Sequence, residues 1–429
     1  MPTKPQSLTI RSYNVGFGDC YLLSFKYATR ERHILIDFGS TRLPKGYPKK
    51  HMATIANDIK ARCNGKLDAV VATHRHKDHI SGFATTGGAS SSGAIIRNLN
   101  PSRVVQPWTE DPDLPTTATG PRLRRLGRAA PAHALNLRAM NQFSKWVAAA
   151  KFPRFFSKEL REQLAFLGEN NIANKSAVNN LMAMAPNSYV HCGSKSGLES
   201  LLPGVKIDVL GPPTVDQTDT IKSQKDEDEN EFWHLAARRA RVGGKDRGQP
   251  APLFKNHVRS TGGAPFPVES RWFIYHARMQ RTDQLLQIVR MLDDAMNNTS
   301  VILLFRVGKK SILFPGDAQL ENWMYALNQE KYSKLLEEVD VYKVGHHGSL
   351  NATPKSLWKL FKKRSATAGS GRLQTLMSTL AGVHGKEHSH TEVPREALTN
   401  ELKRQSDHFS TQSLKDATPF YKDITVTFA

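Results

Sequence analysis

The stretch LDAVVATHRHKDHISGF, residues 67–83, decides how the chain folds and where its chemistry lies. Its first part is an apolar run, which is typical of a strand buried on both faces. Four polar residues follow directly: His74, His76, Asp78 and His79. Side chains two apart in an extended segment face the same way, so His74 and His76 share a side and the other two follow around a turn. Imidazole and carboxylate groups bind Zn²⁺ and related divalent ions, so the motif predicts a site with ligands for two adjacent ions.

A polar surface turn is the structural alternative for this motif. Random composition would give three histidines and an aspartate at this spacing on the order of once in a thousand such chains. The spacing therefore favours a metal site over a surface turn.

The composition is that of a folded protein. The chain has 429 residues, 39% of them hydrophobic and 23% charged, which fits two domains or one large domain with insertions. No apolar run approaches the roughly 18 to 20 residues needed to cross a bilayer, and the first 20 residues hold no hydrophobic signal core. We therefore expect a cytoplasmic protein that does not enter a membrane. Cys20, Cys63 and Cys192 lie far apart, which predicts free thiols.

The net charge is strongly positive. Sixty Lys and Arg against 39 Asp and Glu give +21, and the field of such a molecule attracts polyanions, so nucleic acid or a nucleotide is a candidate partner. The basic residues are scattered along the sequence, however, and solvated helix faces would account for them equally well. Nothing in the sequence indicates the oligomeric state.

Strands and helices alternate along the chain. Branched and aromatic runs predict a strand meander at residues 7–15, 20–27 and 33–39 and a hairpin at 301–317. Helical spacing predicts helices that include residues 51–65, 284–300, 321–339 and 391–405. This order fits two packed halves with sheets inside and helices outside.

Two segments interrupt this order and predict insertions into a single domain of residues 1–429. Residues from about 109 to 190 are basic and helix-like, with their clearest amphipathic runs at 135–150 and 157–171. Residues from about 215 to 275 are charged and rich in helix breakers, which predicts a loop insertion.

The sequence THRHKDHISGF resembles the His-x-His-x-Asp-His signature of the metallo-β-lactamase superfamily. Other blocks match that family in order: VGFGDCYLL, ILIDFG, LLPGVKIDVLGPP, SILFPGDAQ and YKVGHHGS. Together they look most like the branch that contains the hydrolase domain of bacterial competence DNA-uptake proteins, without the membrane channel. The resemblance implies an α/β class fold with four αββα layers, carrying helical and loop insertions, and two metal ions at the edge of two facing sheets.

By position, the resemblance implies that His74 and His76 bind the first ion and that Asp78 and His79 bind the second. Asp317 in FPGDAQ matches the carboxylate that bridges the two ions. A buried carboxylate at a strand end needs a cationic partner, and metal ions would provide it. An aspartate that caps the turn after Pro315 and Gly316 is the structural alternative.

The late histidine ligand comes from GHHGS. We expect His347 to be the ligand and His346 to be a substrate-facing acid or phosphate contact, although the two roles could be exchanged. His191 is the best-placed candidate for the remaining ligand of the first ion, which part of the related branch lacks. Four other histidines are rivals for that role: His133, His234, His257 and His276.

Asp19 and Asp37 match aspartates near the metal centre of the superfamily, and we expect them to orient ligand imidazoles. The segment STLAGVHGKEHSHTEVP resembles a loop that closes the pocket in the competence-type branch. Either His384 or His390 could contact substrate from this loop, with His390 as the catalytic candidate. A solvated loop histidine is the alternative for both.

Two divalent ions, Zn²⁺ by preference and Mn²⁺ as the alternative, would activate a water molecule, with Asp78 and Asp317 as ligands and proton acceptors. The leading hypothesis is a metal-dependent phosphodiesterase or nuclease. A hydrolase of an ester, lactone or β-lactam carbonyl is the second hypothesis. The third is a nucleic-acid-binding scaffold without catalysis.

Overall fold

The computed structural model describes residues 4–111, 120–121, 174–218, 297–351, 353–385, 391–414 and 419–428. The amphipathic runs expected at 135–150 and 157–171, and most of the helix expected at 284–300, lie outside these residues. The same holds for most of the two expected insertions.

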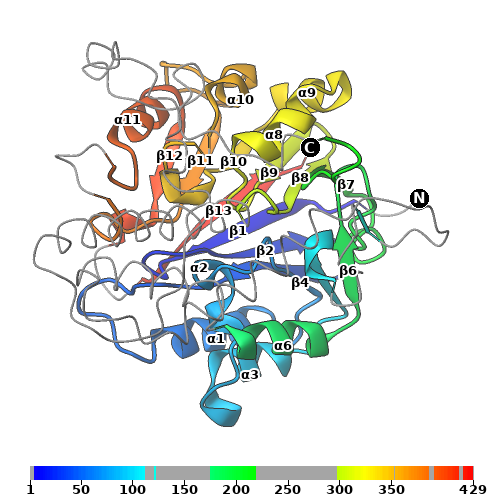
Figure 1. The fold of residues 1–429 in the computed structure, drawn as a ribbon, viewed down its shortest axis with the longest axis vertical. Coiled ribbons are helices and arrows are strands. Elements are labelled where there is room, and N and C mark those ends of the chain that lie inside the picture. The colour runs from blue at the N-terminus through cyan, green and yellow to red at the C-terminus, as the bar shows by residue number, and fades with distance from the viewer. Residues whose placement is uncertain are drawn as a thin grey trace, which may run out of the picture.

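A seven-stranded mixed sheet forms the first half of the molecule (Figure 1). Its strands, in spatial order, are β13 (Tyr421–Thr427), β1 (Ser7–Tyr13), β2 (Cys20–Lys26), β3 (Glu31–Phe38), β4 (Ala69–Val71), β5 (Arg103–Pro107) and β6 (Asn187–Val190). The first four pair antiparallel and the last four pair parallel. The predicted meander is therefore confirmed. Strand β6 pairs with β5 although it lies inside the range 109–190, so the end of that range contributes to the sheet.

A six-stranded mixed sheet forms the second half. Its strands, in spatial order, are β12 (Asp407–Ser410), β11 (Gln374–Met377), β10 (Val341–Lys343), β9 (Lys310–Phe314), β8 (Ile302–Val307) and β7 (Lys206–Gly211). β8 and β9 form the predicted hairpin, with Gly308 in the turn at φ 57°, a left-handed conformation that glycine adopts without strain. From β9 to β12 the strands run parallel.

The two sheets share one apolar core. Alternate residues of each strand point into it, such as Leu8 and Ile10 from β1 and Leu303 and Phe305 from β8, and all four are buried. The opposite faces of the sheets contribute to two further cores that contain helix residues. This packing explains why the central strands of both sheets are almost continuously apolar.

Helices cover the outer face of each sheet (Figure 1). Those on the first sheet are α1 (His51–Arg62), α3 (Ser92–Arg97) and α6 (Lys175–Met184). Those on the second sheet are α8 (Leu320–Leu327), α9 (Glu330–Glu337), α10 (Lys355–Leu360) and α11 (Glu396–Gln405). The short helix α2 (Lys77–Ile80) and the 3₁₀ turns η1 (Ser81–Phe83), η2 (Gly88–Ser90), η3 (Trp108–Glu110), η6 (His346–Gly348) and η8 (Thr411–Ser413) complete the described helical elements.

The single helix expected at 321–339 is wrong, because the segment forms two helices. α8 ends at Leu327, and Gln329 adopts an extended backbone before α9 begins. The hydroxyl of Ser333 donates to the carbonyl of Leu327 at 2.7 Å and so satisfies a group left unpaired at the end of α8. The apolar spacing continues across the break, which is why periodicity alone predicted one helix.

The three cysteines are buried and unpaired, as expected. Within the described residues, no helix has both the length and the apolar character needed to span a bilayer.

Candidate metal centre

The strand ends of both sheets bring the candidate residues together at one edge. The motif follows β4, Asp37 lies near the end of β3, and Asp317 follows β9. His346 and His347 follow β10, which runs parallel to β9. Because parallel strands end at the same edge of a sheet, the neighbours β3 and β4, and β9 and β10, each deliver their polar residues together.

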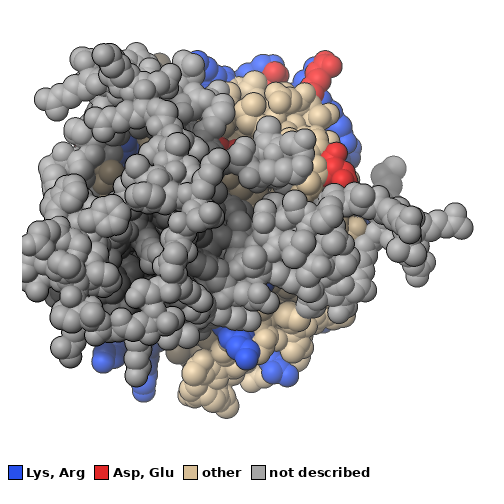
Figure 2. Space-filling view, in the orientation of Figure 1, with Lys and Arg blue, Asp and Glu red and all other residues tan. Residues whose placement is uncertain are grey.

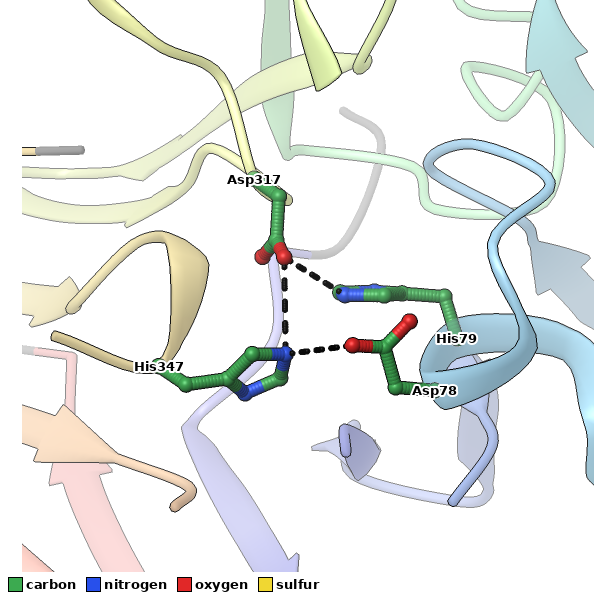
Figure 3. Close-up of side chains that lie close together, drawn as sticks. All are labelled: Asp78, His79, Asp317 and His347. Atoms are coloured by element: carbon green, nitrogen blue, oxygen red, sulfur yellow. Dashed lines mark hydrogen bonds and ion pairs between the residues drawn. The ribbon is translucent and has the colours of Figure 1, made fainter. Parts of the chain in front are cut away.

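Four side chains from three segments form the cluster that we call the acidic-histidine cluster: Asp78, His79, Asp317 and His347 (Figure 3). One ligand atom from each lies within 4.8 Å of the others. Nε2 of His79 lies 3.0 Å from Oδ2 of Asp317. Nε2 of His347 lies 3.1 Å from Oδ2 of Asp78 and 3.4 Å from Oδ2 of Asp317. Donors of this kind and spacing are suited to a single divalent ion.

The orientation of His347 is fixed by its other ring nitrogen. Nδ1 lies 3.0 Å from the backbone carbonyl of Ser378, which can only accept a hydrogen bond. Nδ1 therefore carries the proton, and in the neutral ring the lone pair of Nε2 faces Asp78 and Asp317. This is the arrangement of a metal-binding histidine held by a backbone group.

His79 is held in the same way by a carboxylate. Its Nδ1 lies 2.8 Å from Oδ2 of Asp37. Asp37 in turn accepts hydrogen bonds from the backbone N–H of Thr73 at 2.8 Å and from its hydroxyl at 2.7 Å. Asp37 thus contacts the imidazole of His79 and can orient that ring.

The pKa values of the acidic-histidine cluster indicate that its carboxylates and imidazoles need a positive charge between them. Burial on its own would lower the pKa of His79 and of His347, but Asp317 and the other carboxylates outweigh burial and raise both. Burial would raise the pKa of Asp317, but His79, His347 and Lys343 hold it well below its usual range. Two imidazole nitrogens that face ionised carboxylates need either protons or a metal ion between them, so the residues fit a divalent ion.

His74 and His76 lie beside this cluster. The ring centroid of His74 is 4.6 Å from that of His76 and 4.1 Å from that of His79. Nε2 of His74 is buried without a hydrogen-bond partner, and burial together with His79 and His76 lowers the pKa of this imidazole well below its usual value. Among the described residues, neither histidine belongs to a group of three ligands at metal spacing.

His346 points to a different part of the site. Its backbone N–H donates to Oδ1 of Asp317 at 2.9 Å, and its Nδ1 lies 2.7 Å from the hydroxyl of Ser349. Burial lowers its pKa to about 4, so the ring is neutral at pH 7. His346 and His347 both have left-handed backbones, at φ 42° and φ 51°, which cost conformational energy in non-glycine residues. This strained turn separates the two rings, and His347 is the one that joins the acidic-histidine cluster.

Asp19 forms a second group at metal spacing with Asp37 and His79, and it also has a partner that the sequence did not predict. It forms an ion pair with the ammonium of Lys343, while its oxygens stay 3.7 Å from Nδ1 of His79 and 3.6 Å from Nδ1 of His347. Lys343 is missing from the residues predicted from sequence. A lysine inside the apolar run VDVYKVG was the signal that could have identified it, because a buried lysine needs a carboxylate partner.

Two other predicted histidines that the structure describes, His191 and His384, lie outside the acidic-histidine cluster. His191 follows β6, and its Nδ1 donates to the carbonyl of Cys192 at 2.9 Å. His384 packs on Phe17 at 4.3 Å between ring centroids, and Phe17 packs on His347 at 4.4 Å. Five candidates lie outside the described residues: His133, His234, His257, His276 and His390.

The cluster predicts how pH affects the protein without metal. His79 and His347 have raised pKa values, so their contribution to stability is present below about pH 6.5 and is lost as the pH rises through the raised values. Asp317 has a lowered pKa, so its contribution is lost only in acid. Metal binding requires unprotonated ligands and therefore opposes the loss of stability at high pH.

We expect added Mn²⁺ to raise the melting temperature, relative to EDTA, more at pH 8 than at pH 6. An equal rise at both values would contradict this picture.

No model of a known protein family matches the chain. A stretch of 89 residues is 34% identical to Recombination protein 2 from Haemophilus influenzae. This stretch is 21% of the chain and 10% of that protein, so the chain matches about a tenth of the relative's length.

Proposed function

We propose that the protein is a metal-dependent hydrolase of the metallo-β-lactamase superfamily, with the four αββα layers of that fold, and that it cleaves phosphodiester bonds in nucleic acid or nucleotides. The acidic-histidine cluster carries the proposal. Asp78 and His79 precede Asp317 and His347 by more than two hundred positions, yet the ligand atoms of all four lie within 4.8 Å of one another. Burying two carboxylates against two imidazoles is costly unless protons or a cation lie between them, and this arrangement supports a metal site.

Two ions are proposed, with Zn²⁺ favoured over Mn²⁺. Asp78, His79, Asp317 and His347 would hold one of them. His74 and His76 would supply ligands to the other, for which the described residues hold no third protein ligand at metal spacing. The two positions are therefore unequal, and the four-ligand position would bind its ion more tightly.

Divalent ions in such a site lower the pKa of water and offset the negative charge that develops on a phosphodiester. Asp78 is the most exposed side chain of the acidic-histidine cluster, at 15%, whereas the other three are at most 1% exposed. It is therefore the carboxylate best placed to meet water and accept its proton. His346, whose backbone N–H contacts Asp317, has a neutral ring, so it can form a hydrogen bond to a phosphate oxygen.

The choice of substrate is supported by charge and by the relative. The chain carries a net charge of +21, which favours polyanions. The relative bears the name Recombination protein 2, and on that name we propose nucleic acid as the substrate class. Figure 2 shows Lys and Arg along both the upper and the lower edge of one face, with Asp and Glu near the upper group. The described part of that face thus mixes both signs, so the proposal rests on the total charge and not on a surface patch.

A substrate panel tests the proposed reaction. Purified protein with Mn²⁺ or Zn²⁺ is incubated with bis-p-nitrophenyl phosphate, single- and double-stranded DNA, RNA and nitrocefin. We expect hydrolysis of the phosphodiesters and a loss of about a hundredfold or more in His76→Ala. Cleavage of nitrocefin alone would favour the carbonyl hydrolase. Binding of DNA without any turnover, together with no stoichiometric metal, would favour the scaffold.

A further inference from the structure

Lys343, the last residue of β10, is a buried cation beside the acidic-histidine cluster. Its ammonium donates to the carbonyl of Gly316 at 3.0 Å, forms an ion pair with Asp19, and lies 3.4 Å from Oδ1 of Asp317. These three acceptors match the three N–H donors of an ammonium group. Each N–H donor of the Lys343 ammonium therefore has an acceptor. Lys343 joins Asp19, which precedes β2 in the first sheet, to Asp317, which follows β9 in the second.

The two oxygens of Asp317 have different partners. Oδ1 faces Lys343 and accepts the backbone N–H of His346 at 2.9 Å. Oδ2 faces Nε2 of His79 at 3.0 Å and Nε2 of His347 at 3.4 Å. One side of the carboxylate is thus bound by a cation of the protein itself, and only the other side faces the ligands of the metal centre.

The charges near the metal centre show why such a cation matters. The metal centre has four buried or nearly buried carboxylates around it: Asp19, Asp37, Asp78 and Asp317. Without a divalent ion, Lys343 still keeps one positive charge in contact with Asp19 and Asp317. With a divalent ion bound, a second cation lies a few ångströms away across the same carboxylate, and the two repel each other.

We propose that Lys343 is a resident cation that keeps Asp19 and Asp317 in place when no divalent ion is bound, and that it lowers the affinity of the centre for that ion. The inference rests on the proposed metal centre. Lys343 is a positioning residue, because it acts through Asp317 and does not reach the substrate. Repulsion between two cations outweighs the modest benefit of a better-ordered carboxylate, so the net effect on ion affinity is a decrease.

The variant Lys343→Met tests both the ordering of the carboxylates without metal and the lowered ion affinity. Methionine keeps much of the length of lysine and removes its charge. In EDTA the melting temperature of the variant should fall by about 5 °C or more, since Asp19 and Asp317 both lose the buried ammonium that they contact. In Mn²⁺ the difference from wild type should shrink. The dissociation constant for Mn²⁺, measured by calorimetry, should be lower than that of wild type by about tenfold or more. Adding Asp19→Asn should restore the metal-free melting temperature, because an amide needs no cation.

Lys310→Met is the matched control. Lys310 pairs with Asp340 at 3.0 Å in the same sheet, away from the metal centre, so its loss should shift the EDTA and Mn²⁺ melting temperatures equally. If Lys343→Met behaves like this control and keeps the wild-type dissociation constant, the proposal is overturned.

Two further outcomes separate the proposal from the metal centre on which it rests. If Lys343→Met does not fold, the double variant Lys343→Met/Asp19→Asn carries the test, and it should fold and bind Mn²⁺ more tightly than wild type. If wild type binds no Mn²⁺ or Zn²⁺, the metal centre itself fails. In that case a metal-free Lys343→Met as stable as wild type would reject the role of Lys343 as well.

Discussion

Asp317→Asn is expected to lower kcat/KM for bis-p-nitrophenyl phosphate on the order of a thousandfold and to release bound metal. Asp317 receives contacts from four groups: the imidazoles of His79 and His347, the ammonium of Lys343 and the backbone N–H of His346. An asparagine has the same shape, but one of its two ends becomes an N–H donor. That end must face either the donors on the Oδ1 side or the metal ligands on the Oδ2 side, so the variant cannot satisfy both sides.

The measurement combines steady-state kinetics with the metal content per chain, determined by elemental analysis. Asp208→Asn is a suitable control, because Asp208 pairs with Arg306 in β7 and β8, on a partly exposed surface away from the centre. It should retain both activity and metal. An Asp317→Asn protein with normal turnover and full metal content would refute the role given to this residue.

Strands β1, β2 and β3 were predictable because the apolar pattern of neighbouring residues determines which side chains are buried. Alternating or continuous apolar runs in β1, β2 and β3 fix which residues face a core, and the sequence shows them directly. The edge strand β13 is different, because Asp423 and Lys422 interrupt its apolar pattern. Its place beside β1 comes from long-range pairing, in which Arg11 forms an ion pair with Asp423 at 2.8 Å. No local pattern encodes a partner four hundred residues away.

The motif HRHKDH located one side of the centre, but the roles of single residues depended on backbone conformation. Adjacent histidines at 346 and 347 look equivalent in sequence. Only the two consecutive left-handed residues determine that His347 meets Asp78 while His346 meets Ser349. The apolar run around Lys343 marks it as a buried lysine that needs a carboxylate, but it does not mark Asp19 as the partner, because that pairing joins the two sheets.

Gly39→Ala is expected to cost at least about 3 kcal/mol of unfolding free energy and to disrupt the acidic-histidine cluster. Gly39 follows β3 and lies directly against the backbone that carries the motif. A Cβ at this position would lie 2.4 Å from the carbonyl carbon of Asp78 and 2.4 Å from the backbone nitrogen of His79. Both neighbours are backbone atoms, so no side chain can rotate away to make room. The helix α2 must shift instead.

A shift of α2 would move two ligands at once, because Asp78 and His79 both belong to it. The expected result is therefore a lower melting temperature together with a loss of metal, whereas a purely structural defect elsewhere would lower the melting temperature only. Gly369→Ala is the matched control, since a Cβ there would meet nothing within 4 Å. It should leave both quantities unchanged. A Gly39→Ala protein that keeps its wild-type stability and metal content would mean that the backbone around Asp78 is not packed as tightly as described, and the geometry of the whole centre would need revision.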